Sequence, residues 1–129
     1  MITTVRVFAR SAPAPDERSL GEVVGARCPV PVIVTRGDHA QAIRELRFIL
    51  EISRPSRGNR KLASLLDDVT SLTCLCIAEE AAERADVRLQ LFEAALGVAR
   101  ATSGFVELDS RDGRSHTFHT PDGKRFYRL

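Results

Sequence analysis

The chain has 129 residues, of which 43% are hydrophobic and 28% are charged. This length and composition fit a single globular domain over residues 1–129 and argue against a disordered chain. The formal net charge of +2 is too small to indicate nucleic acid as the partner. No apolar run approaches the ~20 residues that a membrane-spanning helix needs.

Charge is distributed unevenly along the chain. Residues 1–65 hold eleven basic and six acidic residues, residues 66–108 hold three and eight, and residues 109–129 hold five and three. The three segments therefore carry formal charges of +5, −5 and +2. We interpret this pattern as complementary surfaces within one domain.

The first third of the chain predicts two strands separated by a short helix. β-Branched residues alternate over residues 2–9 and indicate a first strand, and Asp16 is placed to cap the helix. Residues 30–35 predict a second strand. Pro29 and Pro31 indicate either an edge of the sheet or a late entry of the strand into it, because proline cannot donate a hydrogen bond to a neighbouring strand.

The middle of the chain predicts a helix followed by a buried strand. Asp38 and Gln41 resemble a capping box, and the helix that they open ends before Pro55. Residues 69–78 are apolar or small on both faces. This pattern is typical of a strand in the middle of a sheet that helices cover.

The longest predicted helix covers residues 79–102, with a break at Asp86 as the alternative, and Gly104 ends it as a C-cap. Its apolar stripe passes through Ala85, Leu89, Phe92, Leu96 and Ala99. Four further apolar residues widen the stripe: Val87, Leu91, Ala94 and Val98. Since one sheet face would not cover so wide a stripe, the pattern favours a homodimer.

Residues 105–129 predict a β-meander, with turns at residues 110–113 and 121–123. The predicted fold is therefore α+β. It has a mixed sheet of about six strands, two main helices packed on the sheet, and a C-terminal antiparallel β-meander.

The candidates for catalysis are the histidines and aspartates of the tail, His116, His119, Asp109 and Asp112. In a strand, residues three apart face opposite sides, so His116 and His119 are expected to diverge. Aspartates in turns are common for backbone reasons alone. We therefore predict no metal and no cofactor.

The three cysteines do not have the spacing of a zinc site. Cys74 and Cys76 share one face of the strand predicted to be buried, so both are expected to be unreactive core residues. Cys28 is expected in a loop, where a thiol reagent would reach it. Their odd number indicates reduced thiols in the cytoplasm.

Two basic segments are candidates for binding. One is the loop after the second helix, with Arg54, Arg57, Arg60 and Lys61. The other is the last strand, where basic residues alternate with aromatic ones and Arg125 and Tyr127 share a face.

The sequence has no G-x-S-x-G, Walker A, G-x-G-x-x-G or H-E-x-x-H motif. It therefore favours a small bacterial-type, non-catalytic protein-binding module with an accessory, regulatory or immunity-like role, which binds itself or another protein. One alternative is a small hydrolase or nuclease-like enzyme that uses the His/Asp tail. A second is a nucleic-acid binder that uses the loop 54–61 and the tail.

Overall fold

The computed structural model describes residues 4–10, 16–52, 64–109 and 115–128. Within these residues, six strands form one sheet in the order β2-β3-β1-β4-β5-β6. The strands are β1 (Thr4–Ala9), β2 (Ile33–Gly37), β3 (Ser71–Cys76), β4 (Phe105–Asp109), β5 (His116–His119) and β6 (Arg125–Arg128). The helices are α1 (Glu17–Gly25), α2 (His39–Ile52), α4 (Glu79–Ala82) and α5 (Ala85–Thr102).

The α+β fold, the six strands and the C-terminal meander of β4, β5 and β6 are confirmed. Every strand pairing is antiparallel, whereas the sequence predicted a mixed sheet. The position of β2 at an edge is also confirmed. The strand begins at Ile33, a little later than predicted, beyond the two prolines.

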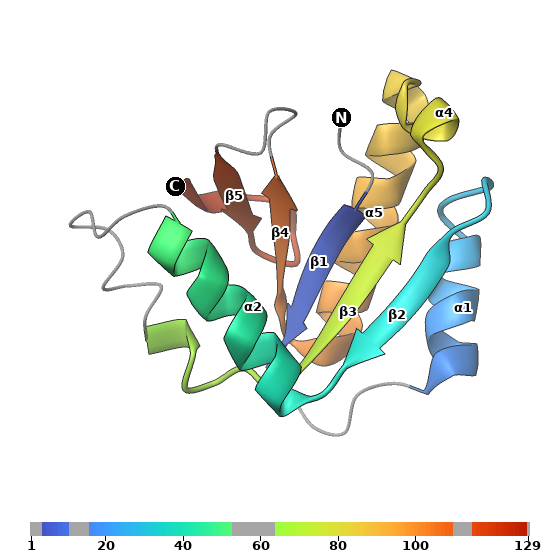
Figure 1. Cartoon of the computed structure of the whole chain (residues 1–129). Helices are drawn as coiled ribbons and strands as arrows, with labels where there is room; N and C mark the ends of the chain where they lie inside the picture. Colours follow the sequence, from blue (N-terminus) through green and yellow to red (C-terminus); the bar gives the residue numbers. More distant parts are fainter. Residues whose placement is uncertain (1–3, 11–15, 53–63, 110–114, 129) are drawn as a thin grey trace.

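The helices lie on both faces of the sheet, with α1 and α5 on one side and α2 on the other (Figure 1). Strand alternation supplies both faces. In β1, Val5 and Val7 point to the α5 side, and Phe8 points to the α2 side.

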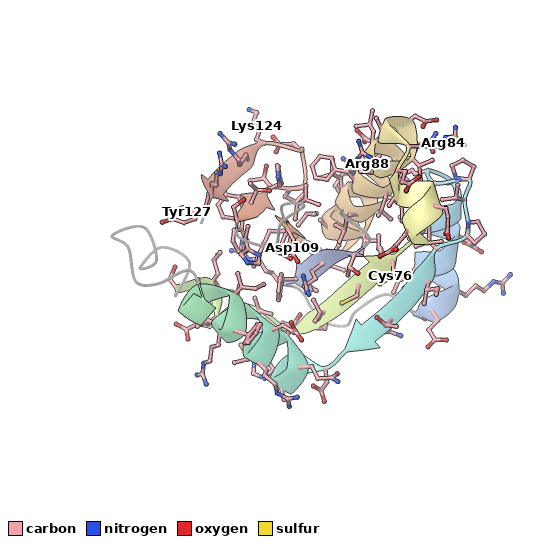
Figure 2. The ribbon with its side chains drawn as sticks, turned by 45° about the horizontal axis from the view of Figure 1, so that its top comes forward. Cys76, Arg84, Arg88, Asp109, Lys124 and Tyr127 are labelled. Carbon is pink, nitrogen blue, oxygen red and sulfur yellow. The ribbon has the colours of Figure 1, made fainter. Side chains whose placement is uncertain are left out.

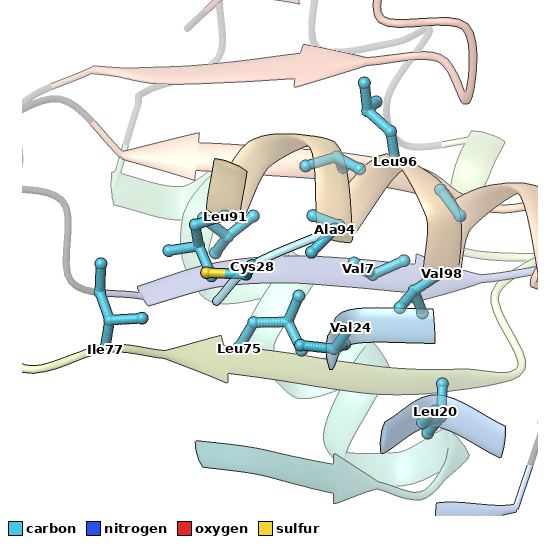
Figure 3. Close-up of a cluster of buried hydrophobic side chains, with 14 of the residues drawn as sticks. Val7, Leu20, Val24, Cys28, Leu75, Ile77, Leu91, Ala94, Leu96 and Val98 are labelled. Atoms are coloured by element: carbon cyan, nitrogen blue, oxygen red, sulfur yellow. The ribbon is translucent and has the colours of Figure 1, made fainter. Parts of the chain in front are cut away.

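The larger core lies between the sheet and the pair α1 and α5. Figure 3 shows Val7 and Leu75 of the sheet beside Leu91, Ala94 and Val98 of α5. Leu20 and Val24 of α1 complete this cluster. The smaller core lies under α2 and is built on the stacked rings of Phe8 and Phe105, whose centroids are 5.2 Å apart.

The apolar stripe of the long helix agrees with the predicted one at Leu96 and Ala99, which are buried, and differs from it nearer the start of the helix. Val87 and Leu91, which were expected to widen the stripe, are its buried centre, and Leu89 is 59% exposed on the outside. The helix is also interrupted at Glu83 and Arg84, ahead of the Asp86 break that the sequence left open. Helix α1 packs on α5, so the wide stripe is covered within the chain.

The end of α5 also differs from its predicted form. The left-handed residue is Ser103, with a φ of 52°, and Gly104 follows it. A Cβ at position 104 would lie 2.1 Å from the carbonyl oxygen of Phe8. Glycine is therefore required there because β1 and β4 approach closely, and not because of its own backbone angles.

Candidate functional site

Polar side chains gather on the α2 side of the sheet, where the strands extend beyond the helix. Figure 2 shows Asp109 of β4 and Cys76 of β3 on this face. Glu107 shares the face with Asp109 because the two lie two residues apart in one strand. Arg6 of β1 lies opposite Glu107 in the strand register, and His116 of β5 lies opposite Asp109.

One hydrogen-bonded cluster joins three of these strands. The Nδ1 atom of His116 lies 2.7 Å from Oε1 of Glu107 and 2.8 Å from Oδ1 of Asp109. A guanidinium nitrogen of Arg6 donates to the other oxygen of each carboxylate, at 3.1 Å to Glu107 and 3.2 Å to Asp109. Arg6 also lies 3.7 Å from a carboxylate oxygen of Glu45 on α2.

The burial of the cluster differs from residue to residue. The side chains of Glu107 and His116 are 1% and 8% exposed, and that of Asp109 is 31% exposed. A buried carboxylate destabilises a fold unless it is paired or hydrogen-bonded. The folded state therefore depends on the hydrogen bonds that Glu107 forms with His116 and Arg6. Glu107 and His116 are therefore shielded from solvent, and solvent contacts the cluster mainly at Asp109.

Burial raises the pKa of Glu107 to about 7, and its hydrogen bond with His116 only partly offsets this. The hydrogen bond with Glu107 raises the pKa of His116 above its usual range, against the opposing effect of burial. Burial also acts to raise the pKa of Asp109, but the hydrogen bond with Glu107 and nearby positive charges hold it below its ordinary value. The shifts have opposite directions in the two carboxyl groups: the pKa of buried Glu107 is raised and that of the more exposed Asp109 is lowered.

Of the four predicted catalytic residues, the structure brings together Asp109 and His116. The divergence of the two histidines is confirmed, since His119 lies on the opposite face, 5.0 Å from the ring of Phe92 and 3.1 Å from the Thr117 hydroxyl. Asp112 lies outside the described residues. Glu107, which the sequence reasoning missed, could have been found because it alternates with Asp109 in one arm of the meander.

The predicted burial of the cysteines is wrong. Cys28 is 3% exposed and belongs to the core between α1 and the sheet, whereas Cys74 and Cys76 are half-buried. The two strand cysteines lie on the α2 side, which that helix covers only in part. The Cys76 sulfur lies 3.3 Å from the Thr4 hydroxyl, and burial raises the pKa of Cys74.

The outer face of α2 combines arginines with exposed apolar side chains. Phe48 is 59% exposed, and exposed Arg44 and Arg47 precede it by one helical turn and by one residue. These side chains, with Ala40 and Ile43, line an open hollow of about 400 Å³. A second cleft, of about 230 Å³, lies between α2 and the strands β2 and β3, and Arg44 borders both.

Among the described residues, no carboxylate pairs with the arginines of this face. In the part of the chain that the structure describes, neither Arg44 nor Arg47 forms an ion pair. Glu45, which lies between them in sequence, turns inward to Arg6 instead. The face therefore presents uncompensated positive charge beside apolar surface.

The predicted binding residues are only partly described. Arg54, Arg57, Arg60 and Lys61 lie outside the described residues. On β6, Arg125 is exposed, and Tyr127 is half-buried against the core under α2. The structure therefore does not bring Arg125 and Tyr127 together as one flat binding platform.

Comparison of the chain with protein-family models, curated proteins and solved structures found no match. Within the described residues, no helix has both the length and the apolar character needed to cross a membrane. The function is therefore argued from the surfaces of this chain alone.

Proposed function

We propose that the protein is a non-catalytic protein-binding module that docks an acidic segment of a partner protein on the outer face of α2. The observation that carries the proposal is the exposed Phe48, which lines one hollow with Arg44 and Arg47, two arginines without ion-pair partners in the described part of the chain. Aromatic and arginine side chains are enriched at the centres of protein interfaces.

The chemistry of the surface favours a segment with both carboxylates and apolar side chains. Arg44 and Arg47 can each donate two hydrogen bonds to one carboxylate, in a bidentate ion pair. The hollow beside Phe48, with its lining of Ala40 and Ile43, accepts an apolar side chain. An amphipathic helix with acidic residues beside its apolar stripe offers both kinds of group at the right spacing.

A nucleic acid fits this surface less well. Ala40, Ile43 and Phe48 line much of the hollow, and these side chains offer no group that binds a phosphate. The whole chain has a net charge of only +2. As for its compartment, we propose the cytoplasm, since three free cysteines suit a reducing environment.

The proposal is tested by fluorescence anisotropy with a labelled helical peptide of glutamate and leucine residues. We expect saturable binding that weakens at least about tenfold in Arg44→Glu combined with Arg47→Glu, a loss typical of interface hot spots. Phe48→Ala should weaken binding similarly. Arg18→Glu is the matched control, since Arg18 is 91% exposed on α1, away from this face.

Equal binding by the wild type, the α2 variants and the control would overturn the proposal. So would tighter binding of a single-stranded oligonucleotide with a steep dependence on salt, because that result identifies a nucleic-acid surface instead.

A further inference from the structure

We propose that Glu107, Asp109 and His116 form a binding site for a divalent transition-metal ion such as Zn²⁺. This inference concerns the sheet face beside α2 and is independent of the partner proposed for the outer face of that helix. The three residues offer two carboxylate oxygens and one imidazole nitrogen, which are common ligands of such ions.

The ligand atoms already converge on one point. Oε1 of Glu107, Oδ1 of Asp109 and Nδ1 of His116 all lie within 4.8 Å of one another. The imidazole nitrogen is 2.7 and 2.8 Å from the two oxygens. In a tetrahedral zinc site, neighbouring ligand atoms are about 3.3 Å apart. Each of these two nitrogen–oxygen distances would therefore have to lengthen by about half an ångström for the ion to bind.

Arg6 does not occupy the position of the ion. Its guanidinium contacts Oε2 of Glu107 and Oδ2 of Asp109, the oxygens that face away from the imidazole. Each carboxylate therefore has one oxygen fixed by the arginine and the other directed to the point of convergence. Outer hydrogen bonds of this kind orient the carboxylate ligands of metal sites.

The formal charges of the cluster also suit a divalent cation. The guanidinium of Arg6 faces three carboxylates, those of Glu45, Glu107 and Asp109. When an ion binds, the imidazole must be neutral and the carboxylates ionised. Arg6 and the three carboxylates then carry a net charge of −2, and one of the three carboxylates is almost fully buried. A divalent ion supplies the missing charge, which burial of Glu107 otherwise makes costly.

The backbone holds the three ligands on rigid elements. Glu107 and Asp109 belong to β4, and His116 lies opposite Asp109 on the paired strand β5. Sites carried on paired strands are held more firmly than sites on loops. Asp109, with 31% of its side chain exposed, gives the route by which an ion enters.

The test uses the full chain, freed of metal by a chelator, and titrated with Zn²⁺ in a calorimeter. We expect one ion to bind per chain. Asp109→Asn and His116→Gln should each weaken binding by at least about a hundredfold, since loss of an outer-shell partner alone costs about 10–100-fold. His119→Gln, on the opposite face, and Cys74→Ser combined with Cys76→Ser should keep the wild-type affinity.

A second measurement needs no variant. Nitrogen NMR of the wild type should show the His116 Nδ1 resonance shifting on addition of Zn²⁺, while His119 stays unchanged. The absence of saturable binding would overturn the proposal. Binding that survives in Asp109→Asn and His116→Gln but is lost in the cysteine or His119 variants would overturn it equally.

Discussion

At the scale of single residues, the absence of a side chain at Gly104 allows β1 and β4 to pair closely. A Cβ at Gly104 would lie 2.1 Å from the carbonyl oxygen of Phe8, next to the pair Phe8 and Phe105 in the β1–β4 register. Gly104→Ala should lower the free energy of unfolding by about 2–4 kcal/mol, because the backbone must shift. The measurement is denaturant unfolding.

The matched control for Gly104 is Gly21. It lies inside α1, and a Cβ there meets no atom within 4 Å. Gly21→Ala should stabilise the protein by about 0.5–1 kcal/mol, because alanine has the higher helix propensity. A similar effect from both substitutions would contradict the assignment of Gly104 to a close approach.

The cysteines give a second test at this scale. In the native protein, a thiol reagent should modify Cys76 and Cys74 well before Cys28, which is 3% exposed. Cys74 should follow Cys76, since burial raises its pKa and lowers the fraction of reactive thiolate. Mass spectrometry of the labelled peptides would establish the order, and denatured protein should lose it. Rapid modification of Cys28 would disprove the packing of α1.

The acid–histidine cluster was predictable only in part. Strand alternation places Glu107 and Asp109 on one face, and the predicted antiparallel return of the next strand brings His116 opposite Asp109. Arg6 could not be predicted as their partner. It belongs to a strand about a hundred residues earlier, and its position beside β4 depends on the strand order of the whole sheet.

At the scale of elements, α5 shows why a wide apolar stripe is ambiguous. The buried residues Val87, Leu91, Ala94 and Val98 form a stripe at helical spacing, and so do the residues that the sequence favoured. Periodicity alone does not say which of two adjacent stripes faces the sheet. The choice here follows from α1, which packs on α5 and covers what would otherwise be an open side.

Two substitutions on α5 distinguish these stripes. Leu91→Glu should unfold the protein or destabilise it by more than about 4 kcal/mol, because it buries an unpaired charge where the wild-type side chain is 0% exposed. Leu89→Glu should change the stability by less than about 0.5 kcal/mol, since Leu89 is 59% exposed. Thermal unfolding of both variants would check this. The reverse ranking would restore the stripe predicted from the sequence.

Helix α1 has a cap that responds to pH. The Asp16 carboxylate accepts a 2.7 Å hydrogen bond from the Ser19 amide, and the hydrogen bonds of Ser19 hold the pKa of Asp16 below its ordinary value of 3.8. A carboxyl group whose pKa is lowered in the folded state stabilises that state at pH values above its unfolded-state pKa. This stabilisation is lost as the pH falls through the lower, folded-state value.

Amide hydrogen exchange at Ser19 should therefore accelerate as the pH falls below 3.8, after correction for the intrinsic rate. Asp16→Asn keeps an acceptor oxygen but does not titrate, so its corrected exchange should not depend on pH in this range. An identical pH dependence in the wild type and in Asp16→Asn would show that another group controls the end of the helix.

At the scale of the whole molecule, the two edges of the sheet are unlike. The β6 edge carries exposed Arg125 and Arg128, and charged residues discourage strands of another molecule from pairing there. On the β2 edge, Ile33 is 68% exposed. A hollow of about 120 Å³ lies on the α1 side of the same edge, lined by residues such as Val30 and Val32.

The β2 edge also carries exposed Arg36, and the β6 edge also carries Phe126, which is 42% exposed. With one exposed arginine against two and the more exposed apolar side chain, the β2 edge is the less protected against pairing.

We therefore expect self-association of this protein to use the β2 edge and not the stripe on α5. Light scattering across a dilution series should show a mass that rises with concentration, and Ile33→Lys should hold the mass at that of a monomer, because a charged edge residue opposes strand pairing. Phe48→Lys is the matched control, since Phe48 is similarly exposed, at 59%, but lies on α2. A monomer at all concentrations would refute self-association. A rise in mass that Phe48→Lys removes and Ile33→Lys leaves intact would instead place a second copy on the outer face of α2, where the partner segment is proposed to bind.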